Sequence, residues 1–323
     1  MPEAIVLREP GPPGVLRVES IEVGDAGAGQ LRLRQTYVGV NFHDCYVRSG
    51  LYKTLTLPGI PGLEAVGVVE AVGEGVTGFA VGDRVAYFTN TYGSYATARL
   101  ISAELPVKIP DGIDDRTVAA TWLRGLTAQM LAYSVFPIRA GHTVLIHAAA
   151  GGVGLLLSQL ARHLGATVIG TVGSAAKAEL ARSAGCHHTI LYREENFVER
   201  VREITNGRGV DVSYDSVGKD TFAGSLEVLG IRGHLCNFGQ SSGPIAPFLI
   251  SQLFGKSNSI SRPALSHYFV GEEREPMAAR LFQALKSGLM TADQAHEYSF
   301  ADAPRAHEDL EGRKTNGAVL LVV

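Results

Sequence analysis

The stretch His142–Gly165 reads HTVLIHAAAGGVGLLLSQLARHLG and carries the strongest indication of the fold. An apolar strand, Thr143–His147, runs into the small residues Ala148–Gly154, and an apolar helix, Val153–Leu164, follows at once. Small residues let the backbone approach a pyrophosphate, and a helix N-terminus binds the anion, so this context favours a dinucleotide site. The spacing is A-x-x-G-x-x-G, with Ala148 in the first place, instead of the usual G-x-G-x-x-G. The motif alone therefore leaves a purely structural turn as the alternative.

Strands and helices alternate around this turn, from about residue 114 to residue 262. Such alternation predicts a doubly wound parallel sheet with right-handed crossovers, and Gly154 would let the helix pack closely on the strand. The expected helices are Asp115–Phe136, interrupted by Gly125, then Lys177–Ser183 and Phe197–Thr205. The further expected strands are Thr167–Val172, Thr189–Leu191, Val210–Asp215 and His234–Phe238.

The two ends of the chain have a different residue pattern from this alternating region. Short strand patterns separated by glycine and proline predict an antiparallel, barrel-like module in the first third. In the last third, two helical stretches precede the apolar run Ala318–Val323, a strand that we expect to return to the first module. The strands expected in the first third are Glu3–Arg8, Leu16–Val23, Gln30–Gly39, Gly62–Gly73 and Gly82–Tyr87. The helices expected in the last third are Arg274–Ser287 and Ala303–Leu310.

Composition excludes several classes of protein. The chain has 323 residues, 46% of them apolar, and a net charge of -3, which argues against intrinsic disorder and against a nucleic-acid binder. The three cysteines form no CxxC and no disulfide framework, which indicates a reducing compartment. No signal peptide or membrane span is readable, so we expect a cytoplasmic protein without a membrane partner. Glycine is in excess, at 38 residues, and calls for local explanations.

The end of the second strand of the alternating region indicates which coenzyme binds. Folds that prefer NAD carry an acidic residue there, which holds the ribose 2′-hydroxyl. After Thr167–Val172 this chain has Gly173, Ser174 and then Lys177, with no carboxylate. A small turn with a lysine accepts a 2′-phosphate, so we predict NADPH. The alternative is that Lys177 lies on the solvated face of the next helix, as most lysines do.

Several segments together resemble the NADPH-dependent quinone oxidoreductases, the zeta-crystallin-like branch of the medium-chain dehydrogenase/reductases. The resemblance rests on AAAGGVG at Ala148–Gly154, on GVNFHDCYVRSGLY at Gly39–Tyr52, and on YDSVG at Tyr214–Gly218. It covers essentially the whole chain. It implies an α/β fold in which a Rossmann doubly wound sheet is combined with a GroES-like β-barrel catalytic domain, with the coenzyme in the cleft. The implied domains are 1–123 (catalytic), 124–262 (NADPH-binding) and 263–323 (return to the catalytic domain).

The same resemblance implies that no metal takes part. In the zinc-dependent relatives a cysteine after Gly-Val and a histidine in Gly-His-Glu bind the catalytic metal. Here Asn41 and Leu63 stand at those places, and neither is a plausible zinc ligand. We interpret His43, His142 and His147 as ordinary polar or strand-terminal histidines. We therefore expect a zinc-free enzyme.

A metal-free reductase needs hydrogen-bond donors for the oxyanion that forms on a quinone or enone. The resemblance places Asn41–Tyr52 at the nicotinamide end of the coenzyme. We expect Tyr46 and Tyr52 to be donors near the acceptor, and Asn41 to position the nicotinamide or the substrate. The alternative is that both tyrosines are packing aromatics and that solvent supplies the proton. Asp44 is expected to cap the local helix, and Cys45 to be inert.

The coenzyme contacts implied by the resemblance fall into strand-end loops, where open α/β sheets bind ligands. Thr127 is expected near the nicotinamide-side phosphate, and Arg262, Pro263 and Ala264 near the carboxamide. Arg313 is expected to add a second positive charge for the adenosine phosphate. The remaining expected cofactor-binding residues are Asn41, Gly152, Val153, Gly173, Ser174, Lys177, Tyr192, Ser216, Val217, Phe238, Gly239, Gln240 and Ser241.

Alternative functions remain open from sequence alone. An NADPH-dependent 2-alkenal or enone reductase would use the same coenzyme geometry on an activated C=C bond. A crystallin-like protein would bind coenzyme with little turnover, and RNA binding is suggested only by analogy with the family. Gly255–Pro263 reads as an edge strand of the nucleotide sheet, and such edges pair across a two-fold axis in the family, so we expect a homodimer.

Overall fold

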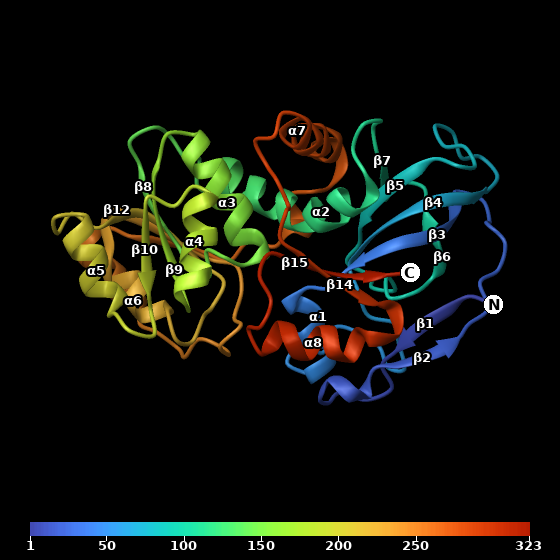
Figure 1. The fold of residues 1–323 in the computed structure, drawn as a ribbon, viewed down its shortest axis with the longest axis horizontal. Coiled ribbons are helices and arrows are strands. Elements are labelled where there is room, and N and C mark those ends of the chain that lie inside the picture. Colours follow the sequence, from blue (N-terminus) through green and yellow to red (C-terminus); the bar gives the residue numbers. More distant parts are fainter. The chain divides into compact units, whose positions relative to one another are not determined.

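The computed structural model describes residues 1–323 and contains the parallel sheet predicted around His142–Gly165 (Figure 1). Its six strands lie in the order β10-β9-β8-β11-β12-β13, and every neighbouring pair is parallel. In chain order this is the Rossmann arrangement 3-2-1-4-5-6, so the predicted fold is confirmed. The strands are β8 (Thr143–Ile146), β9 (Thr167–Val172), β10 (His188–Leu191), β11 (Val210–Asp215), β12 (Leu229–Asn237) and β13 (Ser259–Ser261).

Four helices cover this sheet: α3 (Gly152–His163), α4 (Ala175–Ser183), α5 (Phe197–Ile204) and α6 (Phe222–Glu227). Helix α3 packs on α4, and α5 packs on α6. The strand order reverses between β8 and β11, so right-handed crossovers put the two pairs on opposite faces. On the α5/α6 face, Val201 and Phe222 pack with Leu145, Ile169 and Ile190 of the strands in one buried cluster. Apolar strand composition thus follows from burial on both faces.

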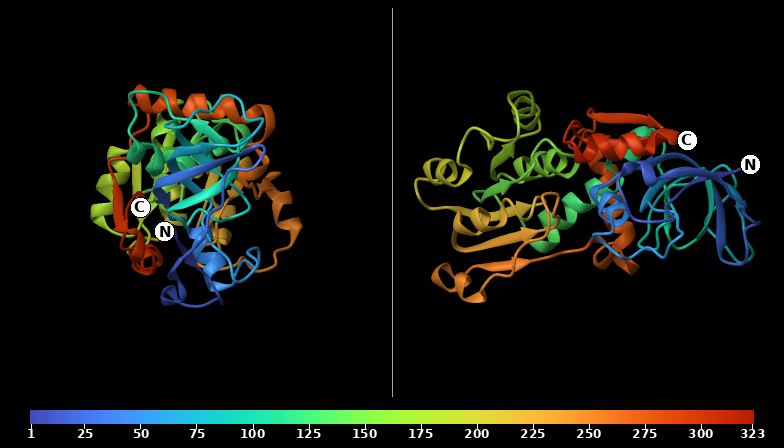
Figure 2. Two further views of the ribbon diagram at one scale, coloured as in Figure 1. Left: turned by 90° about the vertical axis from the view of Figure 1, so that its right-hand side faces the viewer. Right: turned by 90° about the horizontal axis from the view of Figure 1, so that it is seen from below.

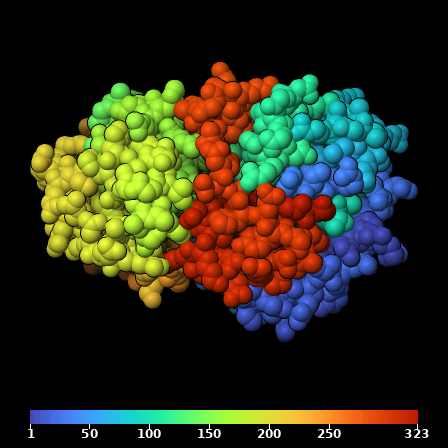
Figure 3. All heavy atoms as spheres, in the orientation of Figure 1, coloured from blue at the N-terminus to red at the C-terminus, as the bar shows by residue number.

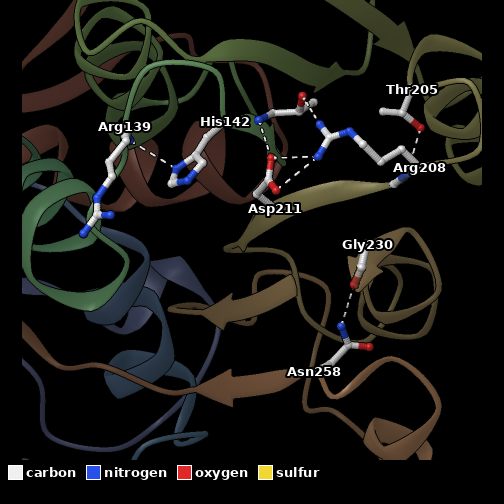
Figure 4. Close-up of polar contacts among 9 residues, drawn as sticks. Arg139, His142, Thr205, Arg208, Asp211, Gly230 and Asn258 are labelled. Carbon is white, nitrogen blue, oxygen red and sulfur yellow. Dashed lines mark hydrogen bonds and ion pairs between the residues drawn. The ribbon is translucent and has the colours of Figure 1, made fainter. Parts of the chain in front are cut away.

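The amino ends of the strands are held together by polar contacts (Figure 4). Asp211 accepts hydrogen bonds from the Thr143 backbone N–H at 2.7 Å and from the Arg208 guanidinium at 3.2 Å. The same guanidinium donates to the Thr143 hydroxyl at 2.6 Å. His142 accepts from the Arg139 N–H at 3.1 Å, which fits the predicted role of an ordinary strand-terminal histidine. The amino ends of these strands therefore have a structural role, and the carboxyl ends of the strands are available to bind ligands.

The antiparallel module is built from both ends of the chain. Its strands follow the order β14-β15-β3-β4-β5-β7, with β6 also paired to β3. Strand β15 pairs antiparallel with β3, Leu320 opposite Gly39, so the predicted return of the C-terminal strand is confirmed. The strands are β3 (Gln30–Gly39), β4 (Glu64–Val72), β5 (Arg84–Phe88), β6 (Ala98–Ser102), β7 (Pro106–Lys108), β14 (Ala295–Ser299) and β15 (Ala318–Val322), with a separate hairpin of β1 (Glu3–Val6) and β2 (Arg17–Ser20).

Helices α1 (Phe42–Ser49) and α8 (Ala303–Glu311) pack against each other in this module. On the face drawn in Figure 3, the red C-terminal segment lies beside the blue N-terminal segment, because α8 also contacts the 3-10 turn η1 (Pro13–Val15). The side chain of Arg48 on α1 donates to Glu311 on α8 at 2.7 Å. These contacts fix the segment that carries Asn41 and Tyr46.

Chain contacts divide the molecule into two units. Unit 1 comprises Met1–Leu123, Ala278–Lys286 and Thr291–Val323, and unit 2 comprises Arg124–Met277 and Ser287–Met290. Residues 263–277 pack within unit 2. Two helices, α2 (Asp115–Gln129) and α7 (Arg274–Lys286), run across the division. The helix predicted for Asp115–Phe136 does not break at Gly125, and its last turn is instead the π-helix η2 (Met130–Val135).

The edge strand predicted for Gly255–Pro263 is shorter than expected. Only Ser259–Ser261 form β13, and the preceding residues form the 3-10 helix η3 (Ile250–Lys256). Ser257 adopts φ 51°, which ends η3 and turns the chain into the strand. In the right-hand view of Figure 2, the orange segment carrying η3 and β13 lies along the edge of the sheet. The remaining 3-10 turns are η4 (Leu265–His267), η5 (Gly271–Glu273) and η6 (Phe300–Asp302).

Candidate active site

The glycine-rich turn joins β8 to α3 at the carboxyl end of the sheet. Gly151 is the extended N-cap of α3, which begins at Gly152 and continues through Val153. A Cβ on Gly154 would overlap the Ala148 carbonyl oxygen and would lie 2.8 Å from the Ala149 Cα. Only glycine lets the helix pack this closely on the turn, so the predicted role of Gly154 is confirmed. The N-terminus of α3 is thereby held at the strand end, where a pyrophosphate would meet it.

A second turn, after β9, gathers the residues predicted for the adenosine phosphate. Ser174 is the N-cap of α4, and its hydroxyl accepts from the Lys177 backbone N–H at 3.4 Å. A Cβ on Gly173 would lie 2.8 Å from the hydroxyl oxygen of Tyr192, which follows β10. The first turn of α4 carries no acidic residue. The structure thus brings Gly173, Ser174, Lys177 and Tyr192 to one place.

The loops after β11 and β12 are bonded to each other. The carbonyl oxygen of Ser216 accepts from Ser241 N–H at 3.2 Å, and a Cβ on Gly239 would lie 2.6 Å from that same oxygen. The Val217 carbonyl accepts from the hydroxyl of Ser242 at 2.8 Å. The predicted residues Ser216, Val217 and Phe238–Ser241 therefore form one pair of loops, next to the turn after β8.

Two buried polar residues that the sequence analysis did not single out hold these loops. Asp215 ends β11, and its Oδ1 accepts from Val217 N–H at 2.8 Å and from Gly218 N–H at 3.0 Å. Asn237 ends β12 and donates to the Asp215 carbonyl at 3.2 Å and to the Gly239 carbonyl at 3.1 Å. Arg262, just after β13, donates to Asn237 Oδ1. The sequence signal that could have identified Asp215 and Asn237 is a polar residue at the end of an apolar strand.

Within unit 1, the sequence Asn41–Tyr52 forms α1 and the turn that follows it. Asn41 is the N-cap of α1, and its backbone N–H donates to Asp44 Oδ2 at 2.8 Å in a capping box. The expected capping role of Asp44 is confirmed. The rings of Tyr46 and Tyr52 meet edge to face, with centroids 5.1 Å apart. The three residues predicted to be catalytic are therefore close neighbours on one short segment.

Two further side chains belong to this aromatic group. The His43 ring meets Tyr52 edge to face at 5.3 Å, and its Nε2 lies 3.0 Å from the hydroxyl of Tyr92. Burial lowers the pKa of His43 to about 4, so the ring is neutral at pH 7. Tyr92 is buried, adopts φ 62°, and also bonds the Thr54 hydroxyl. His43 is predicted from sequence only as an ordinary histidine, and Tyr92, 40 positions from Tyr52, carries no local signal that links it to this group.

The side chain of Asn41 is bound to a buried carboxylate. Asn41 Nδ2 donates to Glu64 Oε1 at 2.9 Å, and Glu64, at the start of β4, is only 1% exposed. Glu64 is not among the predicted site residues, although a carboxylate at the start of a valine-rich strand is an available sequence signal.

The remaining predicted positions are spread over both units. Thr127 is buried on α2, and Pro263 and Ala264 lie between β13 and η4. Arg313 lies in unit 1, in the turn after α8, with φ 57°. Cys45 is buried, and burial raises the pKa of its thiol well above the usual value, which supports an inert thiol. Its Sγ lies 3.5 Å from Nδ1 of His307, a contact that no local sequence pattern indicates.

No group of three or more His, Cys, Asp or Glu side chains is arranged to hold a metal ion. None of the helices is both long enough and apolar enough to span a bilayer.

The sheet order, the glycine-rich turn and the antiparallel module define a medium-chain dehydrogenase/reductase. The alcohol dehydrogenase GroES-like domain model matches residues 27–111, and the zinc-binding dehydrogenase model matches residues 152–284. The chain belongs to the quinone oxidoreductase family of this superfamily, as the sequence resemblance implied.

Among its relatives, a 2-haloacrylate reductase of a Burkholderia species is 44% identical over 99% of this chain and 98% of its own. Quinone oxidoreductase 1 of Escherichia coli is 40% identical over 100% of both chains. A solved structure of Escherichia coli quinone oxidoreductase complexed with NADPH matches with a TM-score of 0.96 and 41% identity, covering 99% of this chain and 100% of that chain. The structure of a Pseudomonas syringae quinone oxidoreductase matches with a TM-score of 0.97 and 39% identity over 100% of both chains.

Proposed function

We propose that this protein is a zinc-free, NADPH-dependent quinone oxidoreductase, which transfers reducing equivalents from NADPH to a small-molecule quinone. The observation that carries the proposal is the turn after β9, where Gly173, Ser174, Lys177 and Tyr192 meet without a carboxylate in the first turn of α4. A carboxylate at this place would repel a 2′-phosphate, whereas a lysine and hydroxyl groups bind one. Full-length similarity to quinone oxidoreductases supports the same function.

We assign the coenzyme to the strand-end loops of unit 2. The pyrophosphate is proposed to bind at Gly152 and Val153, where the N-terminus of α3 supplies N–H groups and a positive dipole. Thr127, Arg262, Pro263, Ala264 and the loops of Ser216–Val217 and Phe238–Ser241 are proposed to bind the nicotinamide half, and Arg313 to add positive charge for the adenosine phosphate. The proposed coenzyme domain is residues 124–262, and the proposed catalytic domain is 1–123 with 263–323, of which residues 263–277 pack within unit 2.

The bound coenzyme would supply a hydride, which is equivalent to two electrons and one proton, to the acceptor. The residues of the chain must then align the acceptor and stabilise the charge that forms on its oxygen. We propose that the hydroxyls of Tyr46 and Tyr52 donate to this oxygen. Quinones accept hydride readily, so water can deliver the second proton that completes the hydroquinone. His43 is neutral because burial lowers its pKa to about 4, so it does not supply that proton as an imidazolium.

We propose that no metal takes part. Asn41 and Leu63 occupy the places at which zinc-dependent relatives carry a cysteine and a histidine, and amide and alkyl side chains are not zinc ligands in such sites. The Asn41 amide is instead bonded to Glu64.

A second candidate function is the reduction of an activated C=C bond. The specific observation in its favour is the 44% identity to a 2-haloacrylate reductase over 99% of the chain. The two functions separate in one assay, in which NADPH oxidation is followed with 1,4-naphthoquinone, a 2-alkenal and 2-chloroacrylate. Quinone reductase activity predicts the highest kcat/KM on naphthoquinone. Turnover of only the alkenal or the haloacrylate would show that the enzyme reduces activated C=C bonds and not quinones. Binding of NADPH without any turnover would indicate a crystallin-like protein.

We further propose that the protein acts as a cytoplasmic homodimer. Beside the edge strand β13, large apolar side chains are exposed: Ile231 (82%), Leu249 (71%), Ile250 (79%) and Phe254 (87%). The segment is nonetheless fixed, because Lys256 donates to the Leu229 carbonyl at 2.7 Å and Asn258 donates to the Gly230 carbonyl at 2.9 Å (Figure 4). A fixed apolar patch beside an unpaired strand edge is typical of an interface between identical chains.

A further inference from the structure

The carboxylate of Glu64 is buried, and N–H groups of different elements donate to it. Oε1 accepts from Asn41 Nδ2 at 2.9 Å, and Oε2 accepts from the Leu123 backbone N–H of α2 at 2.9 Å. With 1% exposure, Glu64 needs such donors to offset the loss of its hydration. The two carboxylate oxygens therefore accept from different parts of the chain, Oε1 from the Asn41 side chain and Oε2 from the backbone of α2.

The neighbouring strand is shaped around this carboxylate. In the register of β3 and β4, Val38 lies opposite Ala65, so Gly39 lies opposite Glu64. A Cβ on Gly39 would overlap Oε1 and would lie 2.5 Å from Cδ and 2.7 Å from Cγ of Glu64. Gly39 has no positive φ, so this position needs glycine for space and not for backbone conformation. The chain therefore keeps a gap in β3 through which Glu64 reaches Asn41.

These contacts fix the orientation of the Asn41 amide. Because Glu64 only accepts, the amide nitrogen must face it, and the amide oxygen faces the other way. The capping box at the start of α1 holds the same residue from its backbone. The amide oxygen has two lone pairs, so it can accept a bond from a ligand as well as from the helix.

The carboxylate also determines what kind of ligand group suits Asn41. A hydrogen bond to a carboxylate polarises an amide, which makes its oxygen a stronger acceptor. An oxyanion beside Asn41 would meet the amide oxygen, which has no hydrogen to donate to it. A ligand group that donates a hydrogen bond is favoured instead.

We propose that Glu64 is a positioning residue that makes Asn41 a hydrogen-bond acceptor for the nicotinamide end of the coenzyme, and not a donor to the acceptor oxygen. The ligand group is a donor, either the carboxamide NH2 or a ribose hydroxyl. The proposal rests on the NADPH-dependent function proposed above. It leaves the oxyanion to Tyr46 and Tyr52.

The test is a swap of the two functional groups, read as the dissociation constant of NADPH from nicotinamide fluorescence. In Glu64→Gln, the new amide satisfies Leu123 N–H with its oxygen and turns its NH2 toward Asn41, which reverses the Asn41 amide. We expect a Kd about 10-fold higher. In the double variant Asn41→Asp with Glu64→Gln, the introduced carboxylate accepts from the introduced amide and presents its other oxygen, so the Kd should return to within about 3-fold of the wild-type value. Glu104→Gln, an exposed glutamate in the same unit, is the matched control.

A second variant keeps the test decisive if Glu64→Gln does not fold. Asn41→Ala should raise the Kd of NADPH about 10-fold with a smaller change in kcat. A fall in kcat at unchanged Kd would show that Asn41 serves the acceptor oxygen and would overturn the proposal. So would a Glu64→Gln protein with the wild-type Kd, or a double variant as weak as the single one.

Two further measurements separate the candidate ligand groups, and separate the role of Glu64 from the proposed NADPH-dependent function. With the 3-acetylpyridine analogue of NADPH, which lacks the carboxamide NH2, the effect of Glu64→Gln disappears if the carboxamide is the partner and persists if a ribose hydroxyl is. In either case Asn41 is the acceptor. If the wild-type protein itself does not bind NADPH, the proposed function fails, whereas tight wild-type binding with no effect of the swap contradicts the role of Glu64 alone.

Discussion

A histidine of the C-terminal helix is buried at the centre of unit 1. Nε2 of His307 lies 2.9 Å from the hydroxyl of Tyr95, which in turn donates to Asp44 at 3.3 Å. Burial, with a smaller contribution from the nearby Arg48 cation, lowers the pKa of His307 to about 3. This chain of contacts links α8 to the capping residue of α1, and the lowered pKa of His307 means that its imidazole is neutral at pH 7.

The depressed pKa predicts a loss of stability in mild acid. The unfolded imidazole titrates near 6.5, so its contribution is complete above that pH and is lost as the pH falls toward 3. At pH 5 the loss from His307 is on the order of 2 kcal/mol. Urea unfolding at pH 7.5 and pH 5 should show it. His307→Gln should be less stable at pH 7.5 but lose less between the two pH values, whereas the exposed His188→Gln should follow the wild-type slope. A His307→Gln protein with the full wild-type acid loss would exclude this residue as the cause.

Lys177 carries the prediction about coenzyme choice. A charge-assisted hydrogen bond contributes about 1.5–3 kcal/mol, so Lys177→Ala should raise the Kd of NADPH by about 10-fold or more. The Kd of NADH, which has no 2′-phosphate, should change little. Fluorescence titration of both coenzymes measures the ratio, and Lys286→Ala, an exposed lysine on α7, serves as control. Equal weakening of NADPH and NADH would mean that Lys177 acts through α4 and not through the phosphate.

Some residue contacts at these sites can be predicted from local sequence, and others cannot. The NADPH prediction rests on Ser174 and Lys177, which lie three positions apart, and a local pattern sufficed to bring them together. Glu64 is 23 positions from Asn41, and His307 is 262 positions from Cys45. Such pairs depend on strand register and helix docking, which no local pattern contains.

At the scale of elements, the turn between β8 and α3 gives the sharpest stability prediction. Gly154→Ala places a methyl group against the backbone of Ala148 and Ala149, which cannot move without shifting β8 or α3. We expect a destabilisation of about 2 kcal/mol and weaker NADPH binding. Gly14→Ala is the matched control, because nothing lies within 4 Å of the added methyl. Denaturant midpoints of the two variants test the expectation, and a Gly154→Ala protein as stable as Gly14→Ala would contradict the close packing.

Periodicity was sufficient for the long elements and failed for the short or irregular ones. Strand Thr167–Val172 was predicted with its observed bounds because it is buried on both faces. Gly125 was expected to interrupt a helix, but α2 continues through it because its surroundings are buried and packing outweighs propensity. The edge strand was expected over Gly255–Pro263 and spans only Ser259–Ser261, since an edge strand has one partner to fix its length.

At the scale of the whole molecule, the exposed patch beside β13 predicts the oligomeric state. Phe254→Asp places a charge where we propose that a second copy packs, so the dimer should dissociate at micromolar concentration. Val81→Asp, another exposed apolar position at 67%, should leave the dimer intact. Size-exclusion chromatography with light scattering measures both, and a monomeric wild-type protein would refute the proposed homodimer.

The assembly of the fold from three chain segments was predictable because of the C-terminal strand. Ala318–Val323 is too apolar to remain unpaired, and β15 pairs with β3 near Gly39. The sequence also predicts where the structure places several of the candidate site residues, in turns after parallel strands and on the segment Asn41–Tyr52, while their roles stay predictions. Asp215, Asn237 and Glu64 each stand at one end of an apolar strand, which is a readable signal, but their hydrogen-bond partners depend on the three-dimensional fold and are not readable from the sequence.

The central claim is reduction of a quinone by NADPH without metal. The most direct measurement is kcat/KM for NADPH and for NADH with 1,4-naphthoquinone, on protein treated with a chelator and freed of metal by gel filtration. We predict undiminished activity after chelation and a preference of at least about 10-fold for NADPH. Loss of activity on chelation that zinc restores, or a preference for NADH, would contradict the account.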